Sequence, residues 1–161
     1  MGSIYNDYIG TAFDLIEKYH QGQVDKGGND YADHLYTVSD LCVDTYGEYS
    51  DEHVVALLHD ILEDTDCTVD VLKREGISQE IIDSIVDVTR KDGETYADFI
   101  IRVSKSETAK HVKMCDLEDN MDITRLKDID KSDFKRLRKY LHSWHFLAGN
   151  ETEEQYREFV K

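Results

Sequence analysis

Apolar residues recur along most of the chain at intervals of three and four positions, which is the spacing of an amphipathic helix. No segment shows the sustained alternation of apolar and polar residues that indicates a half-buried strand. Proline is absent, and glycines such as Gly22, Gly76 and Gly149 separate the periodic segments. The pattern predicts helices near residues 4–20, 31–47, 51–64, 68–75, 78–89, 95–104, 107–121, 131–148 and 151–160. We therefore expect an all-α fold, built as a helical bundle.

Three of the predicted helices carry apolar stripes that we expect to form the core. The stripes are Val54, Leu57, Leu58, Ile61 and Leu62; Ile81, Ile82, Ile85 and Val88; and Phe134, Leu137, Leu141, Trp144 and Leu147. Cap residues support the predicted boundaries. Ser50, Thr68 and Ser78 each precede a periodic segment, and Gly76 follows one.

The length of 161 residues fits one domain of ordinary size, spanning residues 1–161. No apolar run approaches the roughly 18 residues of a membrane span, so we expect no membrane association. The first residues lack a basic region followed by an apolar stretch, so a secretory signal is not expected. The three cysteines, Cys42, Cys67 and Cys115, are scattered and predict free thiols in a cytoplasmic protein.

The formal net charge is −16, from 19 Lys and Arg against 35 Asp and Glu. Such a chain repels polyanions at long range, so we expect no nonspecific nucleic-acid binding. A ligand that carries phosphate would need a metal ion and a local cluster of basic residues to bind here.

Four side chains suggest a metal site: His34, the adjacent pair His59 and Asp60, and Asp116. Two imidazoles and two carboxylates form a mixed nitrogen and oxygen donor set that suits a divalent transition metal. Taken alone, each residue has an ordinary reading. A single histidine is more often a core or surface residue, and the segment around Asp116 fits an acidic surface helix as well as a site.

Two further carboxylates follow the His-Asp pair at a spacing of four residues. On one continuous helix, Glu63 would lie one turn from His59, and Asp64 one turn from Asp60. Carboxylates beside a metal site are typical partners for activating water and transferring protons. The pair is therefore a candidate for the catalytic groups.

The combined motifs are far more specific than their parts, and they resemble the HD-domain metal phosphohydrolases. Residues 20–34 (HQGQVDKGGNDYADH) are similar to the stretch that leads to the first histidine of RelA/SpoT hydrolase domains and their stand-alone homologues. Residues 57–65 (LLHDILEDT) resemble the His-Asp…Glu-Asp-Thr motif, and residues 112–120 (VKMCDLEDN) resemble the Lys-x-x-Asp-x-x-x-Asn motif. The resemblance covers roughly residues 10–148.

The resemblance implies a role for each matching residue. The implied metal ligands are His34, His59, Asp60 and Asp116, with Mn²⁺ as the usual metal. Glu63 and Asp64 match the acidic pair that activates water and moves its proton. The implied nucleotide contacts are Lys26, Tyr31, Asn120 and Tyr140. Arg90, Arg102 and Arg125 are further candidates for holding phosphate oxygens.

Three positions depart from the family pattern. Asp25 stands where the bifunctional RelA/SpoT enzymes carry an arginine that packs on guanine, so a planar cation is lost there. Asp122 stands where many members have arginine, and Leu35 replaces the usual proline after the first histidine. These departures concern the substrate more than the metal motifs.

The resemblance implies a metal-dependent hydrolase acting on a small nucleotide. Its best-known reaction removes the 3′-pyrophosphate of guanosine 3′,5′-bis(diphosphate), ppGpp. One alternative is an HD hydrolase acting on another nucleotide, such as an NADPH phosphatase or a deoxynucleotide phosphohydrolase. Another is a metal- and nucleotide-binding regulatory protein with little turnover. The sequence leaves the substrate and the oligomeric state open.

Overall fold

The computed structural model describes residues 2–160, except for the side chains of residues 2, 3 and 125. The described chain is helical, with only an isolated bridge between Val24 and Asp30 outside helices, turns and loops. The expected all-α fold is confirmed. In order, the elements are α1 (Gly2–Tyr19), α2 (Tyr31–Tyr46), α3 (Asp51–Leu58), α4 (Ile61–Asp64), α5 (Val69–Arg74), α6 (Gln79–Val88), α7 (Tyr96–Val103), α8 (Glu107–Met121), the 3₁₀ helix η1 (Ile123–Arg125), α9 (Lys131–Leu147) and α10 (Glu153–Phe159).

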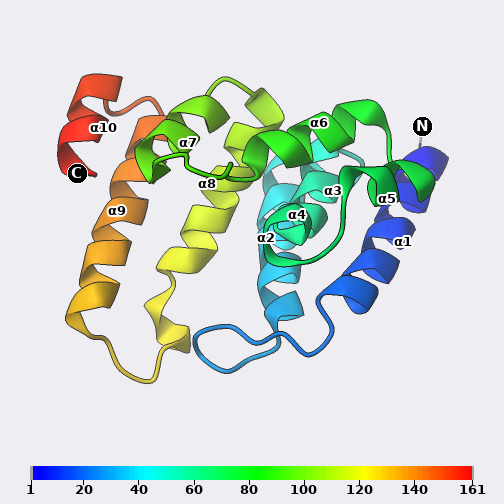
Figure 1. Cartoon of the computed structure of the whole chain (residues 1–161), viewed down its shortest axis with the longest axis horizontal. Helices are drawn as coiled ribbons and strands as arrows, with labels where there is room; N and C mark the ends of the chain where they lie inside the picture. The colour runs from blue at the N-terminus through cyan, green and yellow to red at the C-terminus, as the bar shows by residue number, and fades with distance from the viewer. Residues whose placement is uncertain (1, 161) are drawn as a thin grey trace.

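The helix α3 lies at the centre of the bundle and packs against α1, α2, α6 and α8. It is apolar on every side, and its residues 54–58 are at most 1% exposed. The helices spread along the longest axis of the molecule, from α1 at one end to α9 and α10 at the other (Figure 1). The loop between α1 and α2 and the segment around η1 lie along the same edge of the bundle (Figure 1).

The predicted caps form as expected. The Ser50, Thr68 and Ser78 side chains accept hydrogen bonds from the backbone N–H groups of the first turns of α3, α5 and α6. Gly76 ends α5 with a φ of 86°, a left-handed conformation that a residue with a Cβ adopts only with strain. Local sequence therefore sets these boundaries.

The prediction of one continuous helix over residues 51–64 is wrong. The chain turns at His59 and Asp60, where Asp60 has φ −101° and ψ −2°, and it re-enters helix as the short α4. The backbone N–H groups of both Glu63 and Asp64 donate to the Asp60 carbonyl, at 3.2 and 2.9 Å. The break changes the directions of the His59 and Asp60 side chains from those of a straight helix.

The predicted core stripes hold for α3 with α4 and for α6, although Leu62 is only partly buried. The stripe on α9 is wrong at two positions, because Phe134 is 63% exposed and Leu141 is 46% exposed. Instead, α9 buries Asp133, Ser143 and Leu147. Within residues 2–160, no helix is long and apolar enough to cross a membrane.

Candidate metal centre

The structure brings the four predicted metal-binding side chains to one point in the bundle. His34 comes from α2, His59 and Asp60 from the break between α3 and α4, and Asp116 from α8. The Nε2 atom of His34 lies 3.2 Å from Asp116 Oδ1 and 3.6 Å from Asp60 Oδ2. The Nε2 atom of His59 lies 3.0 Å from Asp60 Oδ2 and 3.6 Å from Asp116 Oδ1. Donor atoms of His34, His59 and Asp60 all lie within 4.8 Å of one another, close enough to bind one ion.

Both imidazoles are oriented with Nε2 toward this point. The Nδ1 atom of His34 bonds to Asp119 Oδ2 at 2.5 Å, and the Nδ1 atom of His59 bonds to the Ala56 carbonyl at 2.7 Å. A proton on Nδ1 leaves the Nε2 lone pair for a metal, an arrangement typical of metal-ligating histidines. Among described residues, His59 Nε2 is buried beside the carboxylate oxygens of Asp60 and Asp116 and makes no well-aligned hydrogen bond to them. Two imidazoles and two carboxylates that converge in this way form a donor set that fits a divalent transition metal.

The two carboxylates remain charged although Asp116 is buried and Asp60 is partly buried. Burial alone would raise the pKa of Asp116, but Lys113 and the two imidazoles outweigh it and hold that pKa well below its usual value. The Lys113 Nζ atom lies 2.6 Å from Asp116 Oδ2. Burial also opposes ionisation of Asp60, yet His59 and His34 keep its pKa low. Carboxylates that are ionised at neutral pH are competent metal ligands.

The same interactions raise the pKa values of the two imidazoles. Burial alone would lower the pKa of His59, but Asp60 and Asp116 raise it to about 9. The pKa of His34 rises to about 11, because hydrogen bonds to Asp116 and Asp119 outweigh its burial. In the metal-free protein, protons therefore compensate the two carboxylates, and a divalent cation can replace them.

Glu63 and Asp64 both lie beside this cluster, but in different settings. Glu63 is exposed and lines a cleft of about 230 Å³ together with Asp60 and Asp116. Its Oε2 atom accepts the backbone N–H of Arg90 at 3.0 Å. Asp64 lies on the other side of Asp60, where the Tyr31 hydroxyl approaches its Oδ2 atom at 3.1 Å. Burial and the charge of Asp60 raise the pKa of Asp64.

The Tyr31 hydroxyl links the carboxylates of Asp60 and Asp64 through hydrogen bonds. The hydroxyl of Tyr31 lies 2.5 Å from Asp60 Oδ2, as well as 3.1 Å from Asp64. Its ring stacks on the buried His20 ring at a centroid distance of 5.6 Å. His20 Nδ1 bonds to Gln23, which in turn donates to the Asp64 carbonyl at 3.0 Å. The segment before α2 therefore supports the metal cluster through Tyr31.

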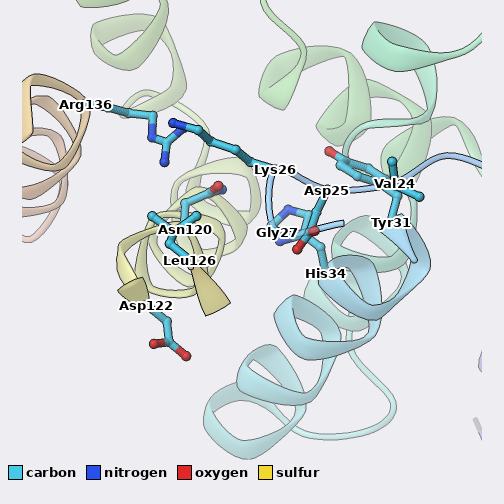
Figure 2. Close-up of a pocket in the computed structure, with 10 residues that line it drawn as sticks. All are labelled: Val24, Asp25, Lys26, Gly27, Tyr31, His34, Asn120, Asp122, Leu126 and Arg136. Atoms are coloured by element: carbon cyan, nitrogen blue, oxygen red, sulfur yellow. The ribbon is translucent and has the colours of Figure 1, made fainter. Parts of the chain in front are cut away.

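A second cavity, of about 210 Å³, opens beside His34. Three of the predicted nucleotide contacts, Lys26, Tyr31 and Asn120, line it, and so do the departures Asp25 and Asp122 (Figure 2). Tyr140 does not line this cavity, but it lines the cleft that contains Glu63. The predicted nucleotide contacts therefore line two adjoining cavities, the one beside His34 and the cleft that contains Glu63.

Two of the predicted nucleotide contacts already have protein partners. Asn120 donates to the carbonyl and to the Oδ1 atom of Asp116, at 3.0 and 2.5 Å, so it also holds a metal-site carboxylate. Lys26 forms an ion pair with the buried Asp133 of α9. Arg136 approaches the same Asp133 carboxylate at 3.1 Å, and its guanidinium lies beside the end of the Lys26 side chain (Figure 2).

The three candidate arginines have different surroundings. The prediction is wrong for Arg102, whose guanidinium is bound to Glu94 and to the carbonyls of Asp87 and Thr89. Arg90 donates to the Glu94 carbonyl and lines the cleft with Glu63. The side chain of Arg125 lies outside the described part of the chain.

No role was predicted from the sequence for several residues that hold the site in place, although Lys113 is the lysine of the Lys-x-x-Asp-x-x-x-Asn motif. Asp119 orients His34, and Lys113 neutralises Asp116. Both lie three positions from Asp116 on α8, so helical spacing could have placed them on the same face. Arg136 and Lys139 of α9 line the two cavities, but nothing in their local pattern distinguished them from a solvated basic helix face.

Known proteins resemble this chain both in sequence and in fold. No family model matches the sequence. Two curated relatives, the GTP pyrophosphokinases of Streptomyces antibioticus and Streptomyces coelicolor, are each 27% identical over 150 residues. The alignment covers 87% of this chain but only 17% of each relative.

A solved structure aligns with nearly the whole chain. It covers 95% of this chain and 93% of its own, with a TM-score of 0.70 and 18% identity. It is described as a metazoan ortholog of SpoT that hydrolyses ppGpp and plays a role in starvation responses. The expected resemblance to RelA/SpoT proteins and the HD-type helical fold are both confirmed.

Proposed function

We propose that this chain is a metal-dependent nucleotide phosphohydrolase that removes the 3′-pyrophosphate of ppGpp, with Mn²⁺ as its metal. The observation that carries the proposal is the convergence of His34, His59 and Asp60 on one point, with Asp116 within 3.6 Å of both imidazoles. The similarity to GTP pyrophosphokinases and the fold of a ppGpp-hydrolysing protein support the nucleotide class.

The chemistry needs an attacking water and a group that accepts its proton. A divalent metal held by His34, His59, Asp60 and Asp116 would polarise that water and offset charge on the phosphate. Glu63 lines the same cleft as Asp60 and Asp116, and its Oε2 atom is held by the Arg90 backbone. This contact helps to position the carboxylate, which would accept the proton of the attacking water.

Asp64 and Tyr31 complete the proton-handling groups. The pKa of Asp64 is raised by burial and by the charge of Asp60, and a carboxyl group beside the metal ligands can take part in proton transfer. Tyr31 donates toward Asp60 and Asp64 and keeps their relative positions. Lys26, Asn120, Arg136 and Tyr140 line the adjoining spaces, where a nucleotide and its phosphates would be held.

A second candidate substrate follows from Asp25. Its carboxylate lines the 210 Å³ cavity and accepts the Asn29 backbone N–H at 2.8 Å. A carboxylate does not stack on a purine as a guanidinium does, and it repels nearby phosphate. Asp25 therefore removes a contact that the family resemblance implies for ppGpp, and it leaves another nucleotide, such as NADPH or a deoxynucleotide, as the second candidate.

The test is a substrate panel. The manganese-loaded chain is incubated in parallel with ppGpp, NADPH and deoxynucleoside triphosphates, and the release of pyrophosphate and phosphate is followed. Glu63→Gln serves as the control that keeps the metal ligands. We expect pyrophosphate release from ppGpp by the wild type and not by Glu63→Gln.

Other outcomes distinguish the alternatives. Phosphate release from NADPH or a deoxynucleotide, with ppGpp untouched, would move the substrate to the second candidate. In that case Asp25→Arg should raise ppGpp turnover relative to the wild type. Stoichiometric metal binding without turnover of any substrate would contradict the enzyme proposal and favour a regulatory binder.

A further inference from the structure

A strongly basic groove lies between α9 and α10. It has a volume of about 590 Å³, and four cationic side chains line it: Lys135, Arg136, Arg138 and Lys139. Ser132 and Phe159 lie among them. Within the described chain, no carboxylate lines this α9–α10 groove. The whole chain carries 35 acidic residues against 19 basic ones, so this local excess of positive charge is unusual for the molecule.

The cations of the groove are poorly neutralised by the protein. Among described residues, no ion pair joins Lys135, Arg138 or Lys139 to a carboxylate. Arg138 instead lies over the Phe159 ring at 5.8 Å, and Lys139 lies over the Tyr96 ring at 4.1 Å. Like charges three and four positions apart on a helix repel each other. A chain with many carboxylates could relieve this repulsion by pairing, and here it does not.

Arg136 offers a further unused donor. It approaches Asp133 through Nη2 at 3.1 Å, but its Nε atom is buried and has no hydrogen-bond partner among described residues. A buried guanidinium N–H without an acceptor is costly. An anion in the groove would supply the acceptor that the protein does not.

The groove adjoins the candidate active site on both sides. Arg136 lines the groove and also the 210 Å³ cavity beside His34. Lys139 lines the groove and also the 230 Å³ cleft that contains Glu63 and Asp116. Apart from Arg136 and Lys139, the residues that line the groove line neither cavity of the site, so an anion can bind in the groove while another occupies the metal centre.

We propose that the α9–α10 groove is a phosphate-binding site distinct from the metal centre. Arg and Lys side chains with a serine hydroxyl are the groups that hold phosphate oxygens in proteins. The net charge of −16 repels such anions at long range, and the groove provides the local attraction that binding requires. The phosphate has two possible sources: a second phosphate group of the bound nucleotide, or free pyrophosphate. Only the first source rests on the proposed function.

The test removes two groove charges without touching residues shared with the site. Lys135 and Arg138 are exposed and line the groove alone, so Lys135→Gln/Arg138→Gln should fold. The matched control is Lys73→Gln/Arg74→Gln on α5, which removes the same charges from an exposed surface at the other end of the molecule (Figure 1). Lys135→Arg/Arg138→Lys preserves the charge and should restore binding.

The first measurement titrates the metal-loaded chain with inorganic pyrophosphate by calorimetry. We expect the affinity of the groove for pyrophosphate to fall about 10-fold or more in the groove variant, because charge-assisted hydrogen bonds are lost. The α5 control and the charge-preserving variant should keep that site. This measurement does not require turnover, so it stands even if the proposed function fails.

The second measurement identifies the source of the phosphate. If the groove binds the substrate's own second phosphate, the groove variant raises KM about 10-fold for a nucleotide with phosphates at two positions, with kcat unchanged. If the groove binds free pyrophosphate, that KM stays at the control value while pyrophosphate binding is lost. A groove variant that matches the α5 control in both pyrophosphate binding and KM would overturn the proposal.

Discussion

The helices α6 and α8 pack against each other and against α3, yet they bury opposite kinds of side chain. α6 buries only aliphatic residues, Ile81, Ile82, Ile85 and Val88. α8 buries two carboxylates, Asp116 and Asp119, among its apolar residues. Burial of aliphatic side chains stabilises the fold, whereas burial of carboxylates opposes it unless partners compensate. α6 therefore contributes mainly to the stability of the core, whereas α8 also supplies residues of the candidate metal site.

The compensation on α8 comes from specific contacts. Asp116 is held by Lys113, Asn120 and the two imidazoles, and Asp119 is held by His34. Each contact also orients a donor atom toward the proposed metal position. The interactions that make the carboxylates tolerable therefore also build the site. Substitutions on the two helices should consequently have separable effects, on stability for α6 and on metal binding for α8 and its contacts.

The largest effect is expected from removing an imidazole that faces α8. His59→Ala deletes the Nε2 atom, so metal affinity should fall by more than about 100-fold, beyond the loss typical of a supporting residue. Turnover should fall with it. Calorimetric titration with Mn²⁺ measures the affinity. Retention of wild-type affinity would mean that His59 does not bind the metal.

A large loss of folding stability is expected from a substitution on α6. Ile85 is fully buried, so Ile85→Ala should reduce the free energy of unfolding by about 2–5 kcal/mol through lost burial and a cavity. Denaturant unfolding measures it. The affinity for Mn²⁺, measured below the unfolding transition, should stay unchanged. A loss of metal affinity in this variant would break the separation between the two helices.

An intermediate effect is expected at Asp119. Its carboxylate fixes the Nδ1 atom of His34, so Asp119→Ala should weaken Mn²⁺ binding by about 10–100-fold. Asp119→Asn is the matched control, because the amide oxygen can still accept from Nδ1, and it should lose less. Equal affinity in Asp119→Ala and the wild type would show that His34 needs no support.

The contrast between α6 and α8 also explains what the sequence could predict. The stripe of α6 has a regular period, so its limits and buried residues were predicted correctly. The limits of α8 were also predicted, but burial of Asp119 was not, because a carboxylate on a helix ordinarily faces solvent. The distant partner His34, 85 positions away, helps to make that burial tolerable.

Other differences have similar causes. The break at His59 and Asp60 follows no proline or glycine, so helical periodicity continued through it in the prediction. The apolar residues Phe134 and Leu141 of α9 follow a helical period but face outward, because α9 packs through Asp133, Ser143 and Leu147. The ion pair between Lys26 and Asp133 joins segments 107 positions apart and has no local signal.

The smallest effect is expected at the N-termini of the two helices. Ser78 caps α6 by accepting from the Ile81 N–H, whereas Ser106 at the start of α8 makes no such side-chain bond. Ser78→Ala should therefore cost about 1 kcal/mol of unfolding free energy, and Ser106→Ala much less. Denaturant unfolding of both variants measures the difference. Equal losses would show that the Ser78 contact does not stabilise α6.

We propose above all that the cluster of His34, His59, Asp60 and Asp116, which joins α2, the break between α3 and α4, and α8, holds a divalent metal. The most direct test of this proposal is a Mn²⁺ titration of the full chain, with thermal unfolding followed at each concentration. The account predicts one bound ion per chain and about 2.7 kcal/mol of added stability at a free concentration of 100 times Kd. The absence of stoichiometric binding, or a melting temperature that does not respond to Mn²⁺, would contradict it.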